Sequence, residues 1–160
     1  MKKFKVYQIS QGADKKESYM NWRIMTEDNH VSLHDHLISD IHIGNDITLY
    51  FDNGFDVKKE NLCNKSGRHK RTGRSAVVLH DAVFMKGIKF LPEEIDKKMD
   101  IAELVNIDLE VLEFSFDHNI GKIEIFGDAW DECLFCKLEF KANKVSYCWN
   151  VFVDDAWFQD

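Results

Sequence analysis

Two similar segments, residues 31–35 and 77–81, each end in a His-Asp pair, a combination that could bind a metal ion. Imidazole and carboxylate groups are ligands for zinc, iron and manganese. The candidate ligand set is His34, Asp35, His36 and His80, and the first two histidines would share one face of a strand. Alternatively, each Asp accepts backbone N–H bonds in an Asx turn and each His packs beside it. We favour this structural interpretation and expect no cofactor.

The four cysteines are Cys63, Cys133, Cys136 and Cys148. Cys133 and Cys136 have the CxxC spacing of zinc sites, but they fall in a predicted strand, where residues three apart point to opposite faces. The sequence has no second CxxC. We therefore expect reduced thiols that behave as small buried side chains.

Familiar catalytic motifs are missing from the sequence, which has no GxGxxG, Walker, GxSxG or HExxH pattern. The common nucleotide-binding and hydrolase sites therefore lack their characteristic parts. A Ser-His-Asp or Cys-His group could still assemble from distant residues. We expect a protein that is not an enzyme. The alternative is a metal-dependent enzyme or ligand-binding β-barrel that uses the His-Asp segments.

Charge is unevenly distributed along the chain. The formal net charge is −7, but residues 65–74 hold five lysines and arginines and no acid, so the rest of the chain carries −12. We expect this basic segment to be a mobile loop between strands, because Gly67 and Gly73 bracket it. The acidic remainder favours a basic protein partner and disfavours nucleic acid. A solvated surface that maintains solubility is the alternative.

The chain ends in a segment, residues 147–160, that combines aromatic and acidic side chains. We expect Trp149 and Phe152 in the core. Trp157 and Phe158 follow the last predicted strand, where they either clamp the tail onto the core or contact a partner or a second copy of the chain as a homodimer. The candidate contacts for a protein partner are Asp128, Asp131, Glu132, Asp154, Asp155, Trp157 and Phe158.

Alternation of apolar and polar residues between turn residues is the dominant pattern, and it predicts about ten antiparallel strands in a sandwich or open barrel. The expected strands are Phe4–Ile9, Asn21–Met25, a hairpin of Leu37–Ile43 with Ile47–Phe51, a pair of Ser75–Leu79 with Val83–Phe90, and a four-stranded meander of Leu109–Phe116, Ile120–Phe126, Leu134–Phe140 and Val145–Phe152. The fold class is mainly β, with α+β as the alternative.

One or two short helices are expected near residues 92–105. Pro92 followed by two glutamates suits a helix start, and Ile95, Met99 and Ala102 would then share a face. Asp100 is a second cap that could restart a short helix.

Length and composition indicate one globular domain, residues 1–160. Alternatively, this domain has two sheet lobes joined near residues 91–106. The chain is 44% hydrophobic and 12% aromatic, which argues against disorder. No apolar run approaches the roughly 20 residues of a membrane span, and no signal-peptide core follows the first residues. We expect a cytoplasmic protein without a membrane partner.

The chain resembles small uncharacterised bacterial proteins of the toxin-immunity type at three places: residues 33–35, the hairpin 47–55 and the closing segment 147–150. Such proteins are encoded beside toxins and neutralise them by binding. The resemblance covers about half the chain and implies a β-rich cytosolic binder without catalysis. It assigns no functional residue. The basic segment 65–74 departs from that type and leaves a different partner open.

Overall fold

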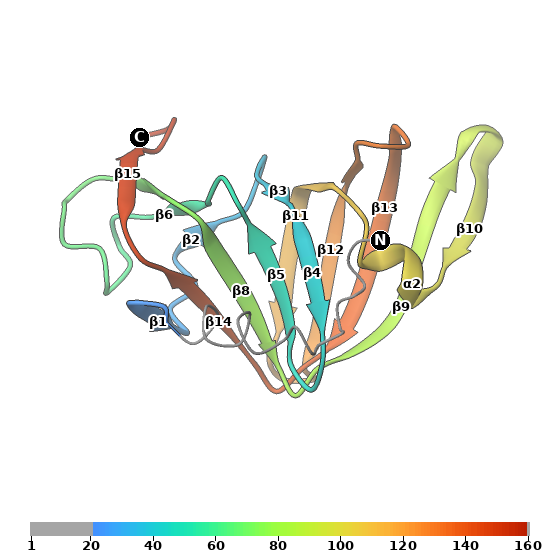
Figure 1. The fold of residues 1–160 in the computed structure, drawn as a ribbon, viewed down its shortest axis with the longest axis horizontal. Helices are drawn as coiled ribbons and strands as arrows, with labels where there is room; N and C mark the ends of the chain where they lie inside the picture. Colours follow the sequence, from blue (N-terminus) through green and yellow to red (C-terminus); the bar gives the residue numbers. More distant parts are fainter. Residues whose placement is uncertain (1–20, 160) are drawn as a thin grey trace.

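The computed structural model describes residues 21–159, and this part of the chain is mainly β, with antiparallel strands (Figure 1). The strands are β1 (Ile24–Thr26), β2 (Val31–Ser32), β3 (Leu37–Ile38), β4 (Asp40–Ile43), β5 (Ile47–Phe51), β6 (Asp56–Val57), β7 (Lys70–Thr72), β8 (Ser75–His80), β9 (Val83–Leu91), β10 (Ile95–Met99), β11 (Leu109–Asp117), β12 (Lys122–Ala129), β13 (Leu134–Lys141), β14 (Lys144–Trp149) and β15 (Phe152–Asp155). The predicted fold class is confirmed. The strand expected at Phe4–Ile9 lies outside the described residues.

The strands form three sheets. The five-stranded sheet has the order β1-β14-β8-β5-β4, the six-stranded sheet β10-β9-β13-β12-β11-β3, and the four-stranded sheet β15-β7-β6-β2. The two larger sheets meet at the bottom of Figure 1 and diverge toward the top. Apolar side chains of both fill the space between them, among them Leu49 and Leu79 from one sheet and Ile125 and Leu138 from the other. The described strands thus form an open sandwich.

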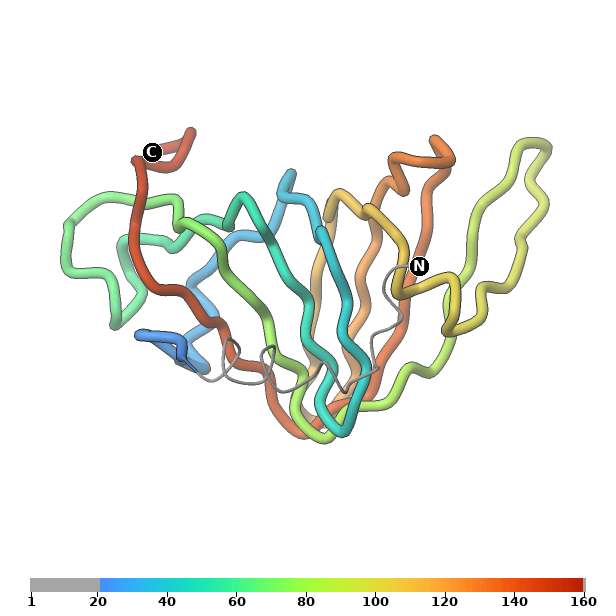
Figure 2. The backbone as a smooth tube through the Cα atoms, in the orientation of Figure 1, coloured from blue at the N-terminus to red at the C-terminus, as the bar shows by residue number. Residues whose placement is uncertain are grey.

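A bent two-stranded ribbon joins the two larger sheets. β8 pairs with β14 in one sheet, and β9 pairs with β13 in the other. Figure 2 shows both connections turning around the bottom of the molecule. At this corner the backbone N–H of Asn143 donates to the carbonyl of His80 at 2.9 Å, and the Asn143 side chain donates to Asp81 at 2.8 Å. The β8–β9 and β13–β14 segments therefore bend side by side, and each passes from one sheet into the other.

The corner corrects two sequence predictions. Ser75–Leu79 and Val83–Phe90 do not pair with each other, and the fourth strand of the predicted meander lies in the other sheet. The two-residue breaks, 81–82 and 142–143, lack the Asn-Gly or Gly-first pattern that favours a tight hairpin turn. The other meander pairings, β11 with β12 and β12 with β13, are confirmed, as is the hairpin of β4 with β5.

Helical structure is shorter than expected between residues 92 and 105. Pro92 begins a 3-10 turn, η2 (Pro92–Glu94), but Glu93 and Glu94 adopt positive φ values of 68° and 62°, which end it. The next residues form β10, because the free edge of β9 offers backbone partners. The helix α2 (Ile101–Leu104) follows, with a capping box that confirms the predicted Asp100 cap. Residues 91–106 connect strands of one sheet, and the two larger sheets are joined at the corner instead.

Candidate functional site

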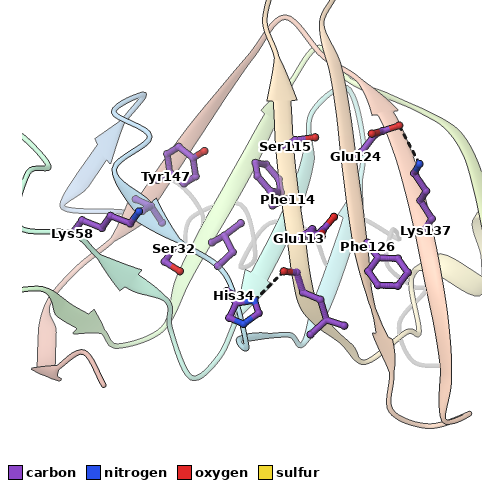
Figure 3. Close-up of a pocket in the computed structure, with 13 residues that line it drawn as sticks. Ser32, His34, Lys58, Glu113, Phe114, Ser115, Glu124, Phe126, Lys137 and Tyr147 are labelled. Carbon is purple, nitrogen blue, oxygen red and sulfur yellow. Dashed lines mark hydrogen bonds and ion pairs between the residues drawn. The ribbon is translucent and has the colours of Figure 1, made fainter. Parts of the chain in front are cut away.

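A groove separates β2 and β14 from β11 (Figure 3). It consists of two adjoining cavities of about 560 and 360 Å³, which share Val31, Phe114 and Tyr147 as lining residues. Figure 3 shows Lys58 and Tyr147 on one side and the strands β11, β12 and β13 on the other. A space of this size suits a small molecule or a short extended peptide.

Strand β11, which lines the groove, is held in place by hydrogen bonds with the segment that contains the first His-Asp pair. The backbone N–H of Asp35 donates to the carbonyl of Val111 at 2.8 Å, and Val111 donates to the carbonyl of His36 at 2.9 Å. The Nδ1 of His34 lies 2.9 Å from the carbonyl oxygen of Leu112 and donates to it, because a carbonyl only accepts. His34 therefore positions β11 at the groove.

Two ionisable groups that line the groove, Glu124 and Tyr147, have pKa values shifted away from neutrality. The hydrogen bond from Lys122 and the charge of Lys137 lower the pKa of Glu124, with nitrogen-oxygen distances of 3.2 and 3.4 Å. Burial raises the pKa of the Tyr147 phenol to about 12. Both shifts move the pKa away from neutrality, whereas a general acid or base works best near the ambient pH. This pair suits binding more than proton transfer.

The structure does not assemble the candidate metal ligands into one site. His36 contacts Asp56 and His80 contacts Ser146, while His34 is bonded to β11. Residues 34–36 form a turn and not a strand face. Over residues 21–159 there is no group of three or more His, Cys, Asp or Glu side chains placed to hold a metal ion.

Both His-Asp segments nonetheless share a local role. Asp35 and Asp81 adopt the left-handed conformation, with φ values of 69° and 50°, which Asp tolerates better than most residues. Asp35 reverses the chain beside β11, and Asp81 lies at the corner of the bent ribbon. The expectation of a shared structural task fits these positions, but neither carboxylate makes the backbone contact of an Asx turn: Asp81 accepts from the Asn143 side chain, and Asp35 lies 3.4 Å from the His34 ring.

The predicted partner contacts fall into two groups at opposite ends of the molecule. Figure 1 places the end of β12 and the β12–β13 connection far from β15 and the C-terminal segment. Asp128 lies near the end of β12, and Asp131 and Glu132 lie in the connection. The seven predicted residues therefore do not form one continuous surface for a partner.

The C-terminal group is largely engaged within the chain. Asp155 pairs with Arg68 and Lys70, both at 2.9 Å, and these contacts lower the pKa of its carboxyl group. Part of the basic segment forms β7, which pairs with β15. Phe158 packs against His69 with ring centroids 4.9 Å apart, whereas Trp157 is 73% exposed. The segment predicted as a mobile loop thus neutralises Asp155, one of the acidic residues predicted to bind a partner.

Of the first group, Asp128 lies on the outer face of the six-stranded sheet, beside aromatic residues that the sequence analysis missed. We call Phe90, Phe126, Asp128, Trp130 and Phe135, together with Glu110, the aromatic-acidic face. The Phe126 and Phe135 rings stack at 5.5 Å, and Phe90 lies 6.3 Å from Phe126. Phe135 and Trp130 are 49% and 53% exposed. The sequence does contain a signal for this face. Phe126 and Phe135 occupy positions at which the alternating pattern of their strands calls for outward-facing polar residues.

Two carboxylates face each other on this surface. Glu110 of β11 and Asp128 of β12 are direct cross-strand partners, an arrangement in which like charges repel. The indole Nε1 of Trp130 donates to Glu110 at 2.9 Å and fixes both side chains. Asp128 has no ion pair with any residue in the range 21–159. The pair is therefore open to a cation from outside.

Glu132 belongs to a separate ion cluster on the other side of the sheet, because its partner Lys89 lies opposite the inward-facing Cys136. The amine of Lys89 is almost buried, with a side-chain exposure of 8%, and lies 2.8 Å from Glu132 and 2.9 Å from Glu103. Burial works to lower the pKa of Lys89, but its hydrogen bonds to the two glutamates outweigh this and raise it. Glu132 is therefore a structural ion partner, and Asp131 lies beside it in the loop.

The prediction that both CxxC cysteines lie in a strand is wrong for Cys133, which precedes β13 in a turn with a positive φ of 56°. The expected burial holds for Cys136 and Cys148, whereas Cys63 is half-buried. Cys133 is exposed in the loop before β13, whereas Cys136 is fully buried on the inner face. Burial raises the pKa of Cys136 to about 11. The four cysteines are all free thiols.

Comparison with protein-family models, curated proteins and solved structures gave no match to this chain. Among residues 21–159, no helix is long and apolar enough to cross a membrane.

Proposed function

We propose that the chain is a non-catalytic protein that binds a basic protein partner through the aromatic-acidic face, and that it acts as an immunity-type protein that neutralises a basic toxin domain such as a nuclease. The observation that carries this proposal is the Glu110–Asp128 carboxylate pair beside a row of aromatic rings, of which Phe135 is exposed and the others are half-buried. Repulsion between the two carboxylates costs stability in the free protein. A lysine or arginine of the partner would relieve it.

Charge distribution supports this face over the C-terminal end. Residues 105–136 contain eight carboxylates and one lysine. At the other end, Arg68 and Lys70 already pair with Asp155. Glu124 and Glu132 pair with lysines, but Glu110 and Asp128 make no ion pair within residues 21–159, so this part of the six-stranded sheet would attract a basic partner.

The aromatic rings support a protein as the partner. Exposed aromatic residues surrounded by polar groups are typical of interface anchors. Trp130 is held by its bond to Glu110 and Phe135 by stacking on Phe126, so little side-chain entropy is lost when a partner binds. An arginine of the partner could stack on these rings and pair with Asp128.

The test uses the protein encoded next to this chain in its genome, purified separately, with Kd measured by calorimetry at low and high salt. We expect binding that weakens with salt, and growth rescue when both proteins are co-expressed. Asp128→Asn should weaken binding about tenfold, and Trp130→Ala by a similar factor. Asp154→Asn, a carboxylate at the opposite end, is the matched control and should have little effect.

Two results would count against the proposal. Absence of binding to the neighbouring gene product would overturn the immunity-type role. Binding that is equally strong in Asp128→Asn, Trp130→Ala and the control would overturn the assignment of the face.

A further inference from the structure

The strand β11 has one side that is only partly paired. It pairs with β12 along its full length, but with β3 only at Leu109 and Glu110. The next two residues bond to the 34–36 segment through Val111 and Leu112. Beyond them, no strand in the range 21–159 pairs with residues 113–117 on this side. The unpaired N–H and C=O groups of such an edge are a template for another strand.

The middle of this edge, Phe114 to Phe116, carries no charged side chain, although a bulge at Leu112 precedes it and Glu113 and Asp117 flank it. The outer strand β10, at the other end of the same sheet, carries Asp96, Lys97 and Lys98, and charged residues of this kind discourage pairing. The sequence of β11 from Phe114 to Phe116 is Phe-Ser-Phe, with high β propensity and neither lysine nor proline. The edge is therefore suited to accept a strand.

The groove described above runs along this edge, and its lining lies on both sides of the sheet. Phe114 and Tyr147 lie on the inner side, whereas Glu113 and Phe126 lie on the outer side. An added strand sends alternate side chains to the two sides of a sheet. A groove that wraps around a strand edge thus matches the two rows of side chains of one extended segment.

The protein itself makes a partial version of this contact. Residues 35–38 lie beside β11 and exchange backbone hydrogen bonds with it as far as Val111. The chain then turns away at Asp35, and the His34 ring supplies one more bond, to Leu112. A strand from another molecule would continue the row from that point.

We propose that the free edge of β11 binds an extended segment of a partner protein by strand addition, with apolar side chains alternating with basic ones. Residues 113–117 span about 17 Å at roughly 3.4 Å per residue, which fits a segment of about five residues. Apolar side chains would contact Phe114 and Phe116 on the inner side, and basic ones Glu113 on the outer side. This binding edge is inferred from the geometry of β11 alone and does not depend on the proposed role in toxin neutralisation.

The experiment uses the full chain and the synthetic peptide Ac-KVKVKVK-NH2, with binding followed by NMR and calorimetry. Two control peptides are N-methylated, one at every valine and one at every lysine. In an added strand only one of these sets of N–H groups faces β11. We expect one methylated peptide to bind about tenfold or more weakly and the other to bind like the parent. Backbone N–H groups within residues 112–117 should become protected from hydrogen exchange.

Other outcomes would overturn the proposal. These are no binding of the parent peptide, equal binding of both methylated peptides, or protection that is confined to residues outside β11. Protection of the same N–H groups in the free protein would mean that the edge is already filled, and sedimentation would show whether a second copy fills it. The Asp128→Asn variant should bind the peptide normally, so a failure of the aromatic-acidic face and a failure of the edge are distinguishable.

Discussion

Replacement of His36 tests whether this histidine is a structural partner or a metal ligand. Its Nε2 donates to Asp56 at 2.8 Å, and the Asp56 side chain is only 1% exposed. The other carboxylate oxygen of Asp56 has no hydrogen-bond partner in the structure. His36→Leu would therefore leave a buried carboxylate without its donor.

The expected loss of unfolding free energy is about 1–3 kcal/mol, the range for a buried polar group that is left without its hydrogen-bond partner. For a chain of this length that corresponds to a decrease in Tm of about 2–12 °C. Guanidinium unfolding gives the free energy, and calorimetry gives Tm. A chelator should leave the Tm of the unmodified protein unchanged.

The matched control is His30→Leu. His30 also contacts an aspartate, Asp28, at 2.6 Å, but its side chain is half exposed. The Asp28 carboxylate keeps the backbone N–H groups of residue 30 and Leu62 as donors, so loss of the half-exposed imidazole should cost only about 0–1 kcal/mol. Equal losses in the two variants would refute the burial argument. A Tm that falls on chelation in the unmodified protein, and not in His36→Leu, would refute the structural role of His36.

Three further variants or reagents probe packing, charge and thiol burial. Gly127→Ala should cost about 1–3 kcal/mol in guanidinium unfolding, because its Cβ would lie 2.4 Å from the carbonyl oxygen of Glu110. Lys89 holds the pKa of Glu103 below its ordinary 4.5, so this stabilisation is present above that pH and is lost as pH falls through the folded-state pKa. In Glu103→Gln the free energy of unfolding should therefore depend less on pH in the acidic range. The Cys136 thiol should resist Ellman's reagent until the protein unfolds, because burial raises its pKa to about 11.

Each of these expectations has a direct control. Gly44→Ala places its Cβ no closer than 3.6 Å to a neighbour and should change stability little, so similar losses at both glycines would contradict the steric argument. An unchanged acid profile in Glu103→Gln would contradict the coupling to Lys89. Exposed Cys133 should react in the folded protein, and equal rates for Cys136 would contradict its burial.

The fold class was predictable because burial on one side of a strand leaves a clear periodic pattern. Ile123 and Ile125 alternate with polar residues, and both are buried between the sheets. The corner was not predictable in the same way. A two-residue break such as Asp81-Ala82 fits either a hairpin turn or a bend, and the choice depends on which strands lie beside it. In the structure β5 and β14 flank β8, so β9 continues into the other sheet.

The candidate site depended on register and on distant pairings. A bulge at Leu112 shifts the pairing of β11 with β12, and a register error of one residue would place side chains on the wrong face. The Glu110–Asp128 pair therefore could not be deduced from sequence. Asp155 lies 85 residues from Lys70 in the chain, and only the pairing of β15 with β7 brings their charges together.

The edge of β11 and the aromatic-acidic face are continuous, and this bears on how a partner would bind. Glu113 and Phe126 are direct cross-strand partners and both line the groove, while Phe126 also stacks within the face. A segment added to β11 would therefore place the rest of its domain close to Asp128. The second contact would then form at a high effective concentration. A whole partner protein should bind much more tightly than a short peptide at the edge, and loss of either contact should weaken the complex by more than the peptide affinity alone suggests.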